Sequence, residues 1–352
     1  MQNAQKRPIL AITLGDAAGI GPEVSLKALL SQEVYRASIP LLIGEGASLR
    51  LTNEMLGNPL ALRPVTSPEE AKGEPGVAEY IDLGLLKENG WALGKVQAIT
   101  GEAAFQAIAR AIQLALEKRV QAVVTAPINK EAINLAGHHF AGHTEIFSHY
   151  TGTKDYGMLL ASPKLRVIHA TTHLSMREAC DALTKQRVLK TIQLADFCRK
   201  LIGLQGKIGV AGLNPHNSEN GLFGFEEHKS ITPAIQRAQA LGIPVEGPIP
   251  PDTIFVKAFA GQYDIVVAMY HDQGHIPVKL SGFVMDEKTG QFSSVRGINC
   301  TIGLPIIRTS VDHGTAFDRA GQNLSREDSM LDAIFMAVRM AEHLSLIQEA
   351  AT

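Results

Sequence analysis

Three histidines follow three apolar segments that we predict to be buried strands. They are His173 after Leu165–His169, His216 after Lys207–Ala211 and His271 after Tyr263–Met269. The carboxyl ends of parallel strands meet at one edge of a sheet, and imidazole nitrogens are common ligands of divalent metals. We therefore expect the three side chains to converge on one metal ion. For any one of them taken alone, a histidine that caps a strand or bonds a loop carbonyl is an equally good interpretation.

The segments that must position these histidines alternate between two patterns. Short β-branched runs predict strands at 9–14, 40–43, 122–125, 166–169, 208–211 and 265–269, and amphipathic periodicity predicts helices at 102–118, 185–200 and 231–241. This alternation is typical of an α/β fold with mostly parallel sheets and helices on both faces. The stretch from Pro59 to Gly94 has no regular pattern that we can assign.

Composition restricts the class of protein. The chain has 352 residues, enough for two domains, and a formal net charge of −2 without a basic run, which argues against nucleic acid as the main partner. The three cysteines lack CxxC spacing, so neither a disulfide framework nor a cysteine-based zinc finger is indicated. No apolar run reaches membrane-spanning length, and the basic residues near the N-terminus lead directly into a strand. We expect a soluble cytoplasmic protein.

The first loop, Gly15–Glu23, lies between a predicted strand and a predicted helix. Pro22 suits the first turn of a helix, and Glu23 complements the positive end of the helix dipole. The loop does not contain the GxGxxG pattern of standard dinucleotide-binding folds. A structural turn and a ligand-binding loop are equally consistent with it.

Two further regions carry polar side chains suited to a small anion. His143 and Thr144 follow Gly142 in a compact polar turn, whereas His138 and His139 are expected to lie in a solvated loop. Downstream, Lys279 shares a predicted loop with His271, and Asn299 and Arg308 flank a predicted strand at 300–307. Lysine and arginine are the usual partners of phosphate and carboxylate groups, so these residues predict an anion site near the metal.

Eight segments of the chain resemble the PdxA family of NAD-dependent 4-hydroxythreonine-4-phosphate dehydrogenases, in family order. They are 15–23, 125–130, 142–145, 170–174, 213–216, 251–253, 270–274 and 307–316. The resemblance implies that His173, His216 and His271 bind a divalent metal. It also implies that the phosphorylated substrate is held by His143, Thr144, Lys279, Asn299 and Arg308. A homodimer with the active site at the subunit interface is implied as well.

A more distant similarity links two loops to the isocitrate and isopropylmalate dehydrogenases. Gly15–Glu23 resembles their GDGIGPE loop, and the segment 313–321 resembles their adenosine-side loop. This similarity places NAD, or alternatively NADP, near His313, Gly314, Thr315 and Asp318. It also implies two α/β/α domains with the active site in the cleft between them. We expect one domain from residues 1–130 and 300–352, and the other, with the metal ligands and dimer interface, from 131–299.

The chemistry implied by the resemblance is oxidation of a secondary alcohol followed by decarboxylation. Such a reaction needs a hydride acceptor, a route for the hydroxyl proton and a Lewis acid, here Zn²⁺, Mg²⁺, Mn²⁺ or Co²⁺. In this family 4-phosphohydroxy-L-threonine gives 3-amino-2-oxopropyl phosphate for pyridoxal phosphate synthesis. The candidate catalytic residues are Asp252, Asp272 and Lys279; the two aspartates are equally consistent with capping loops.

Three departures from the family pattern leave the substrate open. Ala17 replaces the usual proline, the segment 274–277 reads Gly-His-Ile-Pro where the biosynthetic enzymes have Gly-Leu-Pro, and 284–294 resembles an insertion that forms a polar hairpin around Thr289-Gly290. Paralogues that oxidise 4-phospho-D-threonate, 4-phospho-D-erythronate or a cyclic diol carboxylate are therefore alternatives. A metal- and anion-binding protein without redox activity is the non-enzymatic alternative.

Overall fold

The computed structural model describes residues 7–288, 290 and 292–349, and divides the chain into two units. Unit 1 comprises the chain up to Lys154 together with Leu304–Ser345; unit 2 comprises Asp155–Gly303 and the chain from Leu346. The chain first passes from unit 1 to unit 2 after Lys154, whereas we expected this domain boundary at residue 130. The reason is packing, because Ile133 and Phe147 are buried in the same apolar core as Ile108.

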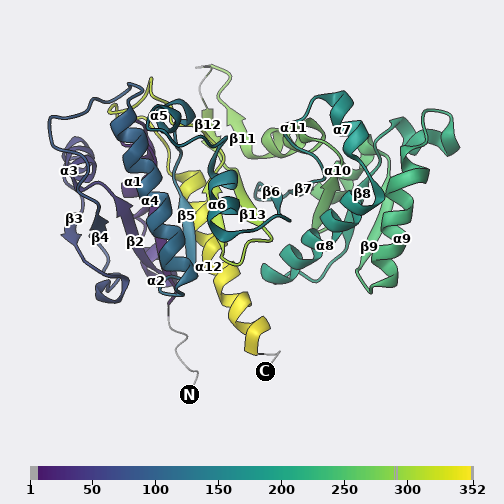
Figure 1. Cartoon of the computed structure of the whole chain (residues 1–352), viewed down its shortest axis with the longest axis horizontal. Helices are drawn as coiled ribbons and strands as arrows, with labels where there is room; N and C mark the ends of the chain where they lie inside the picture. Colours follow the sequence, from purple (N-terminus) through teal and green to yellow (C-terminus); the bar gives the residue numbers. More distant parts are fainter. Residues whose placement is uncertain (1–6, 289, 291, 350–352) are drawn as a thin grey trace. The chain divides into compact units, whose positions relative to one another are not determined.

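Unit 1 contains a parallel sheet of six strands, in the order β3-β4-β2-β1-β5-β14, of which Figure 1 labels β3, β4, β2 and β5. The strands are β1 (Ile9–Thr13), β2 (Ile39–Gly44), β3 (Ala61–Pro64), β4 (Val77–Asp82), β5 (Ala122–Thr125) and β14 (Arg308–Val311). In the register, Thr13 lies opposite both Ile43 and Thr125. The carboxyl ends of β2, β1 and β5 are therefore level, and the loops that leave them share one edge.

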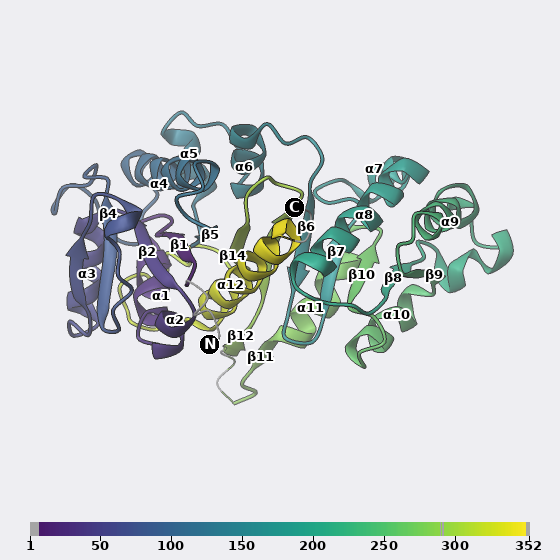
Figure 2. The same ribbon diagram turned by 90° about the horizontal axis from the view of Figure 1, so that it is seen from below.

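The helices of unit 1 cover both faces of this sheet, with α4 and α5 on one side and α1 and α2 on the other (Figure 2). They are α1 (Gly21–Ala28), α2 (Gln32–Ala37), α3 (Gly46–Met55), α4 (Ala98–Leu116), α5 (Lys130–Leu135), α6 (His143–Thr151) and most of α12 (Asp328–Glu349). The apolar positions of α4 recur at helical spacing, and the side chains of Phe105, Ile108 and Ile112 are buried on its inner side.

Unit 2 contains a mixed sheet in the order β13-β6-β7-β10-β8-β9. Its strands are β6 (Gly157–Ala161), β7 (Arg166–His169), β8 (Ile208–Ala211), β9 (Val245–Ile249), β10 (Ile265–Ala268) and β13 (Ile298–Ile302), and its helices are α7 (Met176–Ala182), α8 (Lys185–Leu201), α9 (Thr232–Ala240), α10 (Pro251–Phe259) and α11 (His271–Gly282). β6 is antiparallel to both neighbours, whereas β7, β10, β8 and β9 are parallel. The four parallel strands provide the common edge that the histidine pattern requires.

A two-stranded hairpin follows α11, formed by β11 (Phe283–Met285) and β12 (Phe292–Val295). It confirms the predicted hairpin, although Thr289 of the expected turn lies outside the described residues. The strands are less polar than expected, because they carry the apolar residues Val284, Met285 and Phe292, whose side chains are all exposed. Exposed apolar side chains on a projecting hairpin are typical of a surface that is covered in an assembly.

Most predicted elements are confirmed, and one strand is wrong. The six short apolar runs form β1, β2, β5, β7, β8 and β10, and the predicted helices correspond to α4, α8 and α9. The predicted strand at 300–307 is instead the end of β13, a turn, and the approach to β14. Gly303 has φ +102°, a left-handed conformation that ends the strand, and Pro305 cannot donate a ladder hydrogen bond. In the described part of the chain, no helix is long and apolar enough to cross a membrane.

Candidate active site

The three predicted metal ligands follow three adjacent parallel strands of unit 2, β7, β10 and β8. Ala268 at the end of the central strand lies opposite His169, and Val267 lies opposite Val210. The strand ends are therefore level, and the segments that carry His173, His271 and His216 leave the same edge of the sheet. The fold thus provides the common edge that convergence on one ion would need.

Two of these histidines lie close together. The ring centroids of His173 and His271 are 5.9 Å apart, and both residues line a cavity of about 290 Å³ with Thr171 and Tyr270. The ring of His216 instead lies 6.4 Å from that of Phe223. Within the described residues, no three His, Cys, Asp or Glu side chains form a group that could hold a metal. The three-histidine site stays a prediction.

The backbone at two of these positions is unusual. His173 has φ +52° and His216 has φ +51°, and the left-handed conformation continues from His216 to Asn220. A non-glycine residue rarely adopts this conformation, because its Cβ approaches the following carbonyl oxygen. Strain of this kind persists where surrounding contacts impose it, and it is concentrated at functional sites.

The hydrogen bonding of His271 fits a metal ligand. Its Nδ1 lies 2.6 Å from Oδ1 of Asp272, and the carboxylate accepts the ring N–H. The neutral ring then carries its lone pair on Nε2, as in the carboxylate–histidine pairs that support metal ions in proteins. This bond and the nearby ring of His173 are compatible with a divalent ion that takes nitrogen ligands. Asp272 therefore has the expected orienting contact.

Two imidazoles that the sequence analysis did not assign pack against this pair. The ring centroid of His275 lies 3.6 Å from that of His271 and 4.7 Å from that of His169. Burial lowers the pKa of His275 to about 4 and that of His169 to about 3, so both rings are neutral near pH 7. The signal was available, because His275 is one helical turn after His271 and His169 ends a strand.

The remaining predicted residues of unit 2 are spread along two elements. Residues 271–279 form helix α11 and not the expected loop, so Lys279 lies roughly two turns beyond His271. Gln273 caused the difference, because its side chain bonds the Met269 N–H and the Gly212 carbonyl and fixes the first turn of the helix. Asn299 lies on β13, with Oδ1 buried and without a hydrogen-bond partner in the described structure.

The predicted anion ligand of unit 1, Arg308, is only 3% exposed. It is the first residue of β14, next to β5, and its Nη2 donates to Oγ1 of Thr125 at 2.8 Å. The guanidinium carbon lies 5.6 Å from the ring centroid of Phe147 on α6. These contacts hold the planar cation in a fixed orientation, which favours bidentate recognition of phosphate or carboxylate.

His143 begins α6 beside this arginine. Its Nε2 is buried, with no hydrogen-bond partner in the part of the chain that is described, and burial together with the positive charges of Arg308 and Lys130 holds its pKa well below 6.5. Gly142 precedes the helix without a side-chain cap, so the first N–H groups of His143 and Thr144 remain available. Neutral imidazole, helix amides and two cations form an anion-binding set.

Lys130 is the member of this set that the sequence analysis missed. It is exposed at the start of α5 and has no ion pair with any described residue. Its Cε is 3.7 Å from where a Cβ on Gly142 would lie, which places the lysine stem against the backbone that enters α6. Its position in the Thr125–Lys130 segment, directly after a buried strand, was the available signal.

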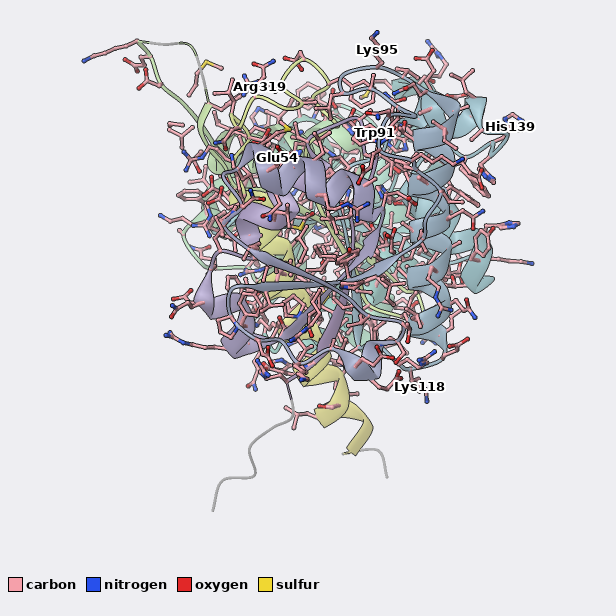
Figure 3. The ribbon with its side chains drawn as sticks, turned by 90° about the vertical axis from the view of Figure 1, so that its left-hand side faces the viewer. Glu54, Trp91, Lys95, Lys118, His139 and Arg319 are labelled. Carbon is pink, nitrogen blue, oxygen red and sulfur yellow. The ribbon has the colours of Figure 1, made fainter. Side chains whose placement is uncertain are left out.

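The two loops compared with NAD-dependent dehydrogenases meet in unit 1. The N–H of Ile20 donates to the carbonyl of Thr315 at 3.0 Å, and a Cβ on Gly19 would lie 2.8 Å from the same oxygen. A third loop joins them, since Gly94 donates to the carbonyl of Ala18 at 2.8 Å. In Figure 3, Trp91 and Arg319 lie at one end of the unit and Lys118 at the other. The predicted cofactor segments therefore contact each other.

The residues predicted to touch the cofactor lie in the segment 313–321. Asp318 is exposed with a weak ion pair to Arg319 at 4.0 Å, and Nδ1 of His313 lies 3.0 Å from the carbonyl oxygen of Gly314. A Cβ on Gly314 would meet no atom within 4 Å, so space is open beside its backbone. These residues remain predicted cofactor contacts.

Asp16 is a buried carboxyl group within the first loop. Its Oδ1 accepts the Ala18 N–H at 2.9 Å, while Oδ2 has no partner among the described residues. Burial raises its pKa to about 6, against the opposing effect of the Ala18 hydrogen bond. The sequence analysis did not assign Asp16, although a lone carboxylate among glycines and alanines marks it.

The contacts correct the expectation for His138 and leave the role of Asp252 open. His138 is not in a solvated loop, because its ring stacks on Phe105 at 3.5 Å and Nε2 lies 2.7 Å from Glu102, whereas His139 is exposed as expected. Asp252 is exposed in the first turn of α10 and makes no hydrogen bond to any described histidine. Its position in the first turn complements the helix dipole, and its catalytic role stays a prediction.

Comparison with known proteins gives matches to a family model and to individual proteins. The family model described as "Pyridoxal phosphate biosynthetic protein PdxA" matches residues 36–337. The chain belongs to the PdxA family. It is 46% identical to D-threonate 4-phosphate dehydrogenase of Cupriavidus necator, covering 95% of this chain and 97% of the relative, and 47% identical to the Salmonella typhimurium enzyme of the same name, covering 94% and 98%.

A solved PdxA-family structure shares the fold. The crystal structure of a 4-hydroxythreonine-4-phosphate dehydrogenase from Burkholderia phymatum superposes with a TM-score of 0.83 at 43% identity, covering 96% of this chain and 99% of the other. This protein is therefore an NAD-dependent PdxA-family dehydrogenase that works by oxidative decarboxylation. Membership of the family implies a nicotinamide cofactor and a divalent metal.

Proposed function

We propose that this PdxA-family enzyme oxidises D-threonate 4-phosphate, with NAD as the hydride acceptor. The observation that carries the proposal is the 46% and 47% identity, over 94% or more of the chain, to enzymes with that substrate in their names. The resemblance in sequence motifs put 4-phosphohydroxy-L-threonine first. The comparisons favour the phosphothreonate alternative, so we reverse that order.

The substrate carries a phosphate, a carboxylate and hydroxyl groups. Removal of hydride from C3 to NAD⁺, with loss of the C3 hydroxyl proton, would give a 3-oxo acid. Cleavage of the C1–C2 bond then releases carbon dioxide, and the electron pair forms an enolate that takes up a proton at C2. The products are NADH, carbon dioxide and a three-carbon keto phosphate, dihydroxyacetone phosphate. Oxidation at C3 thus creates the 3-oxo acid that then loses its C1 carboxylate as carbon dioxide.

The unit 1 set suits the phosphate group. Arg308 is fixed by Thr125 and Phe147, and the N-terminus of α6 offers backbone N–H groups beside His143. We propose that His143, Thr144 and Arg308 bind phosphate oxygens and that Lys130 adds a further positive charge. A phosphate dianion makes charge-assisted hydrogen bonds with such a set, and an uncharged substrate would leave it without a counterion.

The histidines of unit 2 suit the metal, and we propose His173, His216 and His271 as its ligands. When bound, a divalent metal supplies a Lewis acid for the negative oxygen that forms during oxidation and decarboxylation. Zinc, manganese and cobalt match the nitrogen donors better than magnesium does. Asp272 fixes the tautomer of His271 through the bond to Nδ1. Removing Asp272 would release the ring and lower metal affinity.

Lys279 and Asn299 are the other proposed substrate contacts. The buried Oδ1 of Asn299 lacks a partner among the residues described and can accept a hydrogen bond from a substrate hydroxyl. Lys279 has its Nζ 5.1 Å from the ring centroid of Phe283. Its ammonium group is our candidate donor of the proton that C2 takes up after carbon dioxide leaves.

We also propose that the enzyme is a homodimer. Ile276 is 64% exposed and Leu280 is 82% exposed, and their spacing of four residues puts them on one side of α11. Two large apolar side chains of this kind on a helix that carries active-site residues suit a protein interface. Light scattering after size-exclusion chromatography measures the mass, and a monomer would contradict this proposal.

A stoichiometric assay tests the proposed function. The purified enzyme is loaded with Zn²⁺, Mn²⁺, Co²⁺ or Mg²⁺ in turn and given NAD⁺ or NADP⁺ with D-threonate 4-phosphate, D-erythronate 4-phosphate, 4-phosphohydroxy-L-threonine or a cyclic diol carboxylate. We expect one NADH and one dihydroxyacetone phosphate per D-threonate 4-phosphate consumed. Absence of NADH with every substrate and metal would instead favour the binding protein without redox activity.

A further inference from the structure

His275 packs face to face on the proposed metal ligand His271. Their ring centroids are 3.6 Å apart and their planes differ by 11°. The two residues are four positions apart in α11, so they lie on one side of the helix and stack along its axis. A ring in this position restricts rotation of its neighbour about the bonds that set the ring plane.

Two further contacts fix His275 itself. Its Nδ1 donates to the carbonyl oxygen of His271 at 3.0 Å, and the tilted ring of His169 flanks it, with a centroid 4.7 Å from that of His275 and 6.3 Å from that of His271. His169 is held against the helix backbone, since a Cβ on Gly274 would lie 2.3 Å from its Nε2. Both side chains are buried, His275 at 9% exposure and His169 at 1%. The ring of His275 is therefore held by its Nδ1 hydrogen bond and by His169 beside it.

Two constraints thus act on the ring of His271. Asp272 fixes which nitrogen carries the proton, through the bond at 2.6 Å to Nδ1. That bond leaves the ring free to swing with the aspartate, because Asp272 is an exposed side chain. The face of His275 limits this swing. Asp272 and His275 together set the protonation state and the orientation of the His271 ring. These two properties determine where the lone pair of its Nε2 points.

We propose that His275 is a positioning residue that holds the imidazole of His271 in the orientation required for metal binding. The inference rests on the proposed function, in which His271 is a ligand. His275 is not itself placed as a ligand, because nearly parallel stacked rings direct their nitrogen lone pairs along separate planes.

Substitution of His275 tests the proposal through metal affinity. His275→Leu removes the flat ring and the Nδ1 bond, and His275→Phe keeps the flat ring alone. His343→Leu is the matched control, because Nδ1 of His343 also lies near the carbonyl oxygen four residues earlier, that of Arg339, at 2.8 Å. Calorimetric titration with Zn²⁺ and the visible spectrum of the Co²⁺ protein are the measurements, with thermal unfolding to verify the fold.

The expected result is a loss of metal affinity of roughly 10- to 100-fold in His275→Leu, the range for residues that orient metal ligands. His275→Phe should lose less, the Co²⁺ spectrum of His275→Leu should shift, and His343→Leu should match the parent. Parent-like affinity and spectrum in a folded His275→Leu would overturn the proposal while leaving the proposed function intact.

A second measurement does not need a bound metal. In the metal-free protein with ¹⁵N-labelled histidine, long-range ¹H–¹⁵N spectra report the tautomer and mobility of His271. We expect one sharp Nε2-lone-pair signal in the parent and in His343→Leu, and a broadened or mixed signal in His275→Leu. An unchanged His271 signal would overturn the positioning role, whether or not the parent binds metal. Failure of the parent to bind any metal would count against the proposed ligands instead.

Discussion

The anion set of unit 1 and the histidine cluster of unit 2 differ in what holds their side chains. Arg308 is fixed by a hydroxyl group and an aromatic ring, and His143 begins a helix that packs into the core. In unit 2, by contrast, His173 and His216 have left-handed backbones, and the ring contact given for His216 is with Phe223 and not with the other two proposed ligands. The contacts within the protein thus fix the side chains of the first set, whereas they do not bring the three proposed ligands of the second set together.

The largest expected effect comes from a substitution in the histidine cluster of unit 2. His271→Ala removes the proposed ligand that has both an orienting carboxylate and a stacked ring, and we expect metal binding to be lost and kcat/KM to fall by about three orders of magnitude or more. His139→Ala, at an exposed histidine, is the matched control. Metal content by mass spectrometry and NADH formation are the readouts, and full activity in a metal-free His271→Ala enzyme would contradict the account.

The next effect tests the unit 1 side. Arg308→Ala should lower kcat/KM for D-threonate 4-phosphate by roughly two orders of magnitude, because a buried charge-assisted contact contributes a few kcal/mol. Metal affinity should stay within a fewfold of the parent, since no metal ligand is touched. Arg308→Lys keeps the charge without the forked geometry and should recover part of the loss. If Arg308→Ala reduces turnover of unphosphorylated D-threonate by the same factor, Arg308 does not recognise phosphate.

A smaller effect is expected for the cation that the sequence analysis missed. Lys130→Met keeps the apolar stem and removes an exposed charge, so KM for the phosphorylated substrate should rise roughly tenfold with little change in kcat. Lys118→Met, at a lysine that Figure 3 shows at the other end of unit 1 from Trp91, is the control. Equal KM values for parent and Lys130→Met would remove Lys130 from the anion set.

Replacing Asp16 is expected to change metal and phosphate binding least among these substitutions. It should instead change how the free energy of unfolding depends on pH. Its folded pKa of about 6 lies above the ordinary value of 3.8, so folding disfavours the ionised form and the protein is destabilised as pH rises through 6. Asp16→Asn should raise the free energy of unfolding by about 2–3 kcal/mol at pH 8 and much less at pH 4. Denaturant titration at both pH values measures this, and an equal gain at both would show that ionisation is not the cause.

The sequence predicted the elements with strong periodicity and the family-specific segments. β7, β10 and β8 could be predicted because each is a short apolar run with a polar residue at its end, and their common edge followed from the parallel arrangement. The strand at 300–307 was wrong because a single Gly-Leu-Pro turn separates two short strands that read as one apolar run. The local sequence pattern does not show where the chain turns within such an apolar run.

The features that could not be predicted from the sequence depend on contacts between segments that are far apart in the chain. The stacking of His138 on Phe105 depends on how α4 packs, which no spacing near His138 reveals. The 271–279 segment appeared to be a loop because it contains glycine and proline, yet the side chain of Gln273 fixes its helical start. His275 went unassigned for the same reason, since its partner His271 becomes a neighbour only when that segment is helical.

The substrate preference tests the central claim most directly. Purified, metal-loaded enzyme is given NAD⁺ and equal concentrations of D-threonate 4-phosphate and 4-phosphohydroxy-L-threonine in one vessel, and the consumption of each is followed by mass spectrometry, so that the ratio of kcat/KM values is measured under identical conditions. We predict that D-threonate 4-phosphate is preferred by at least about a hundredfold, equivalent to roughly 3 kcal/mol of transition-state binding. Equal consumption, or a preference for 4-phosphohydroxy-L-threonine, would contradict the proposed function.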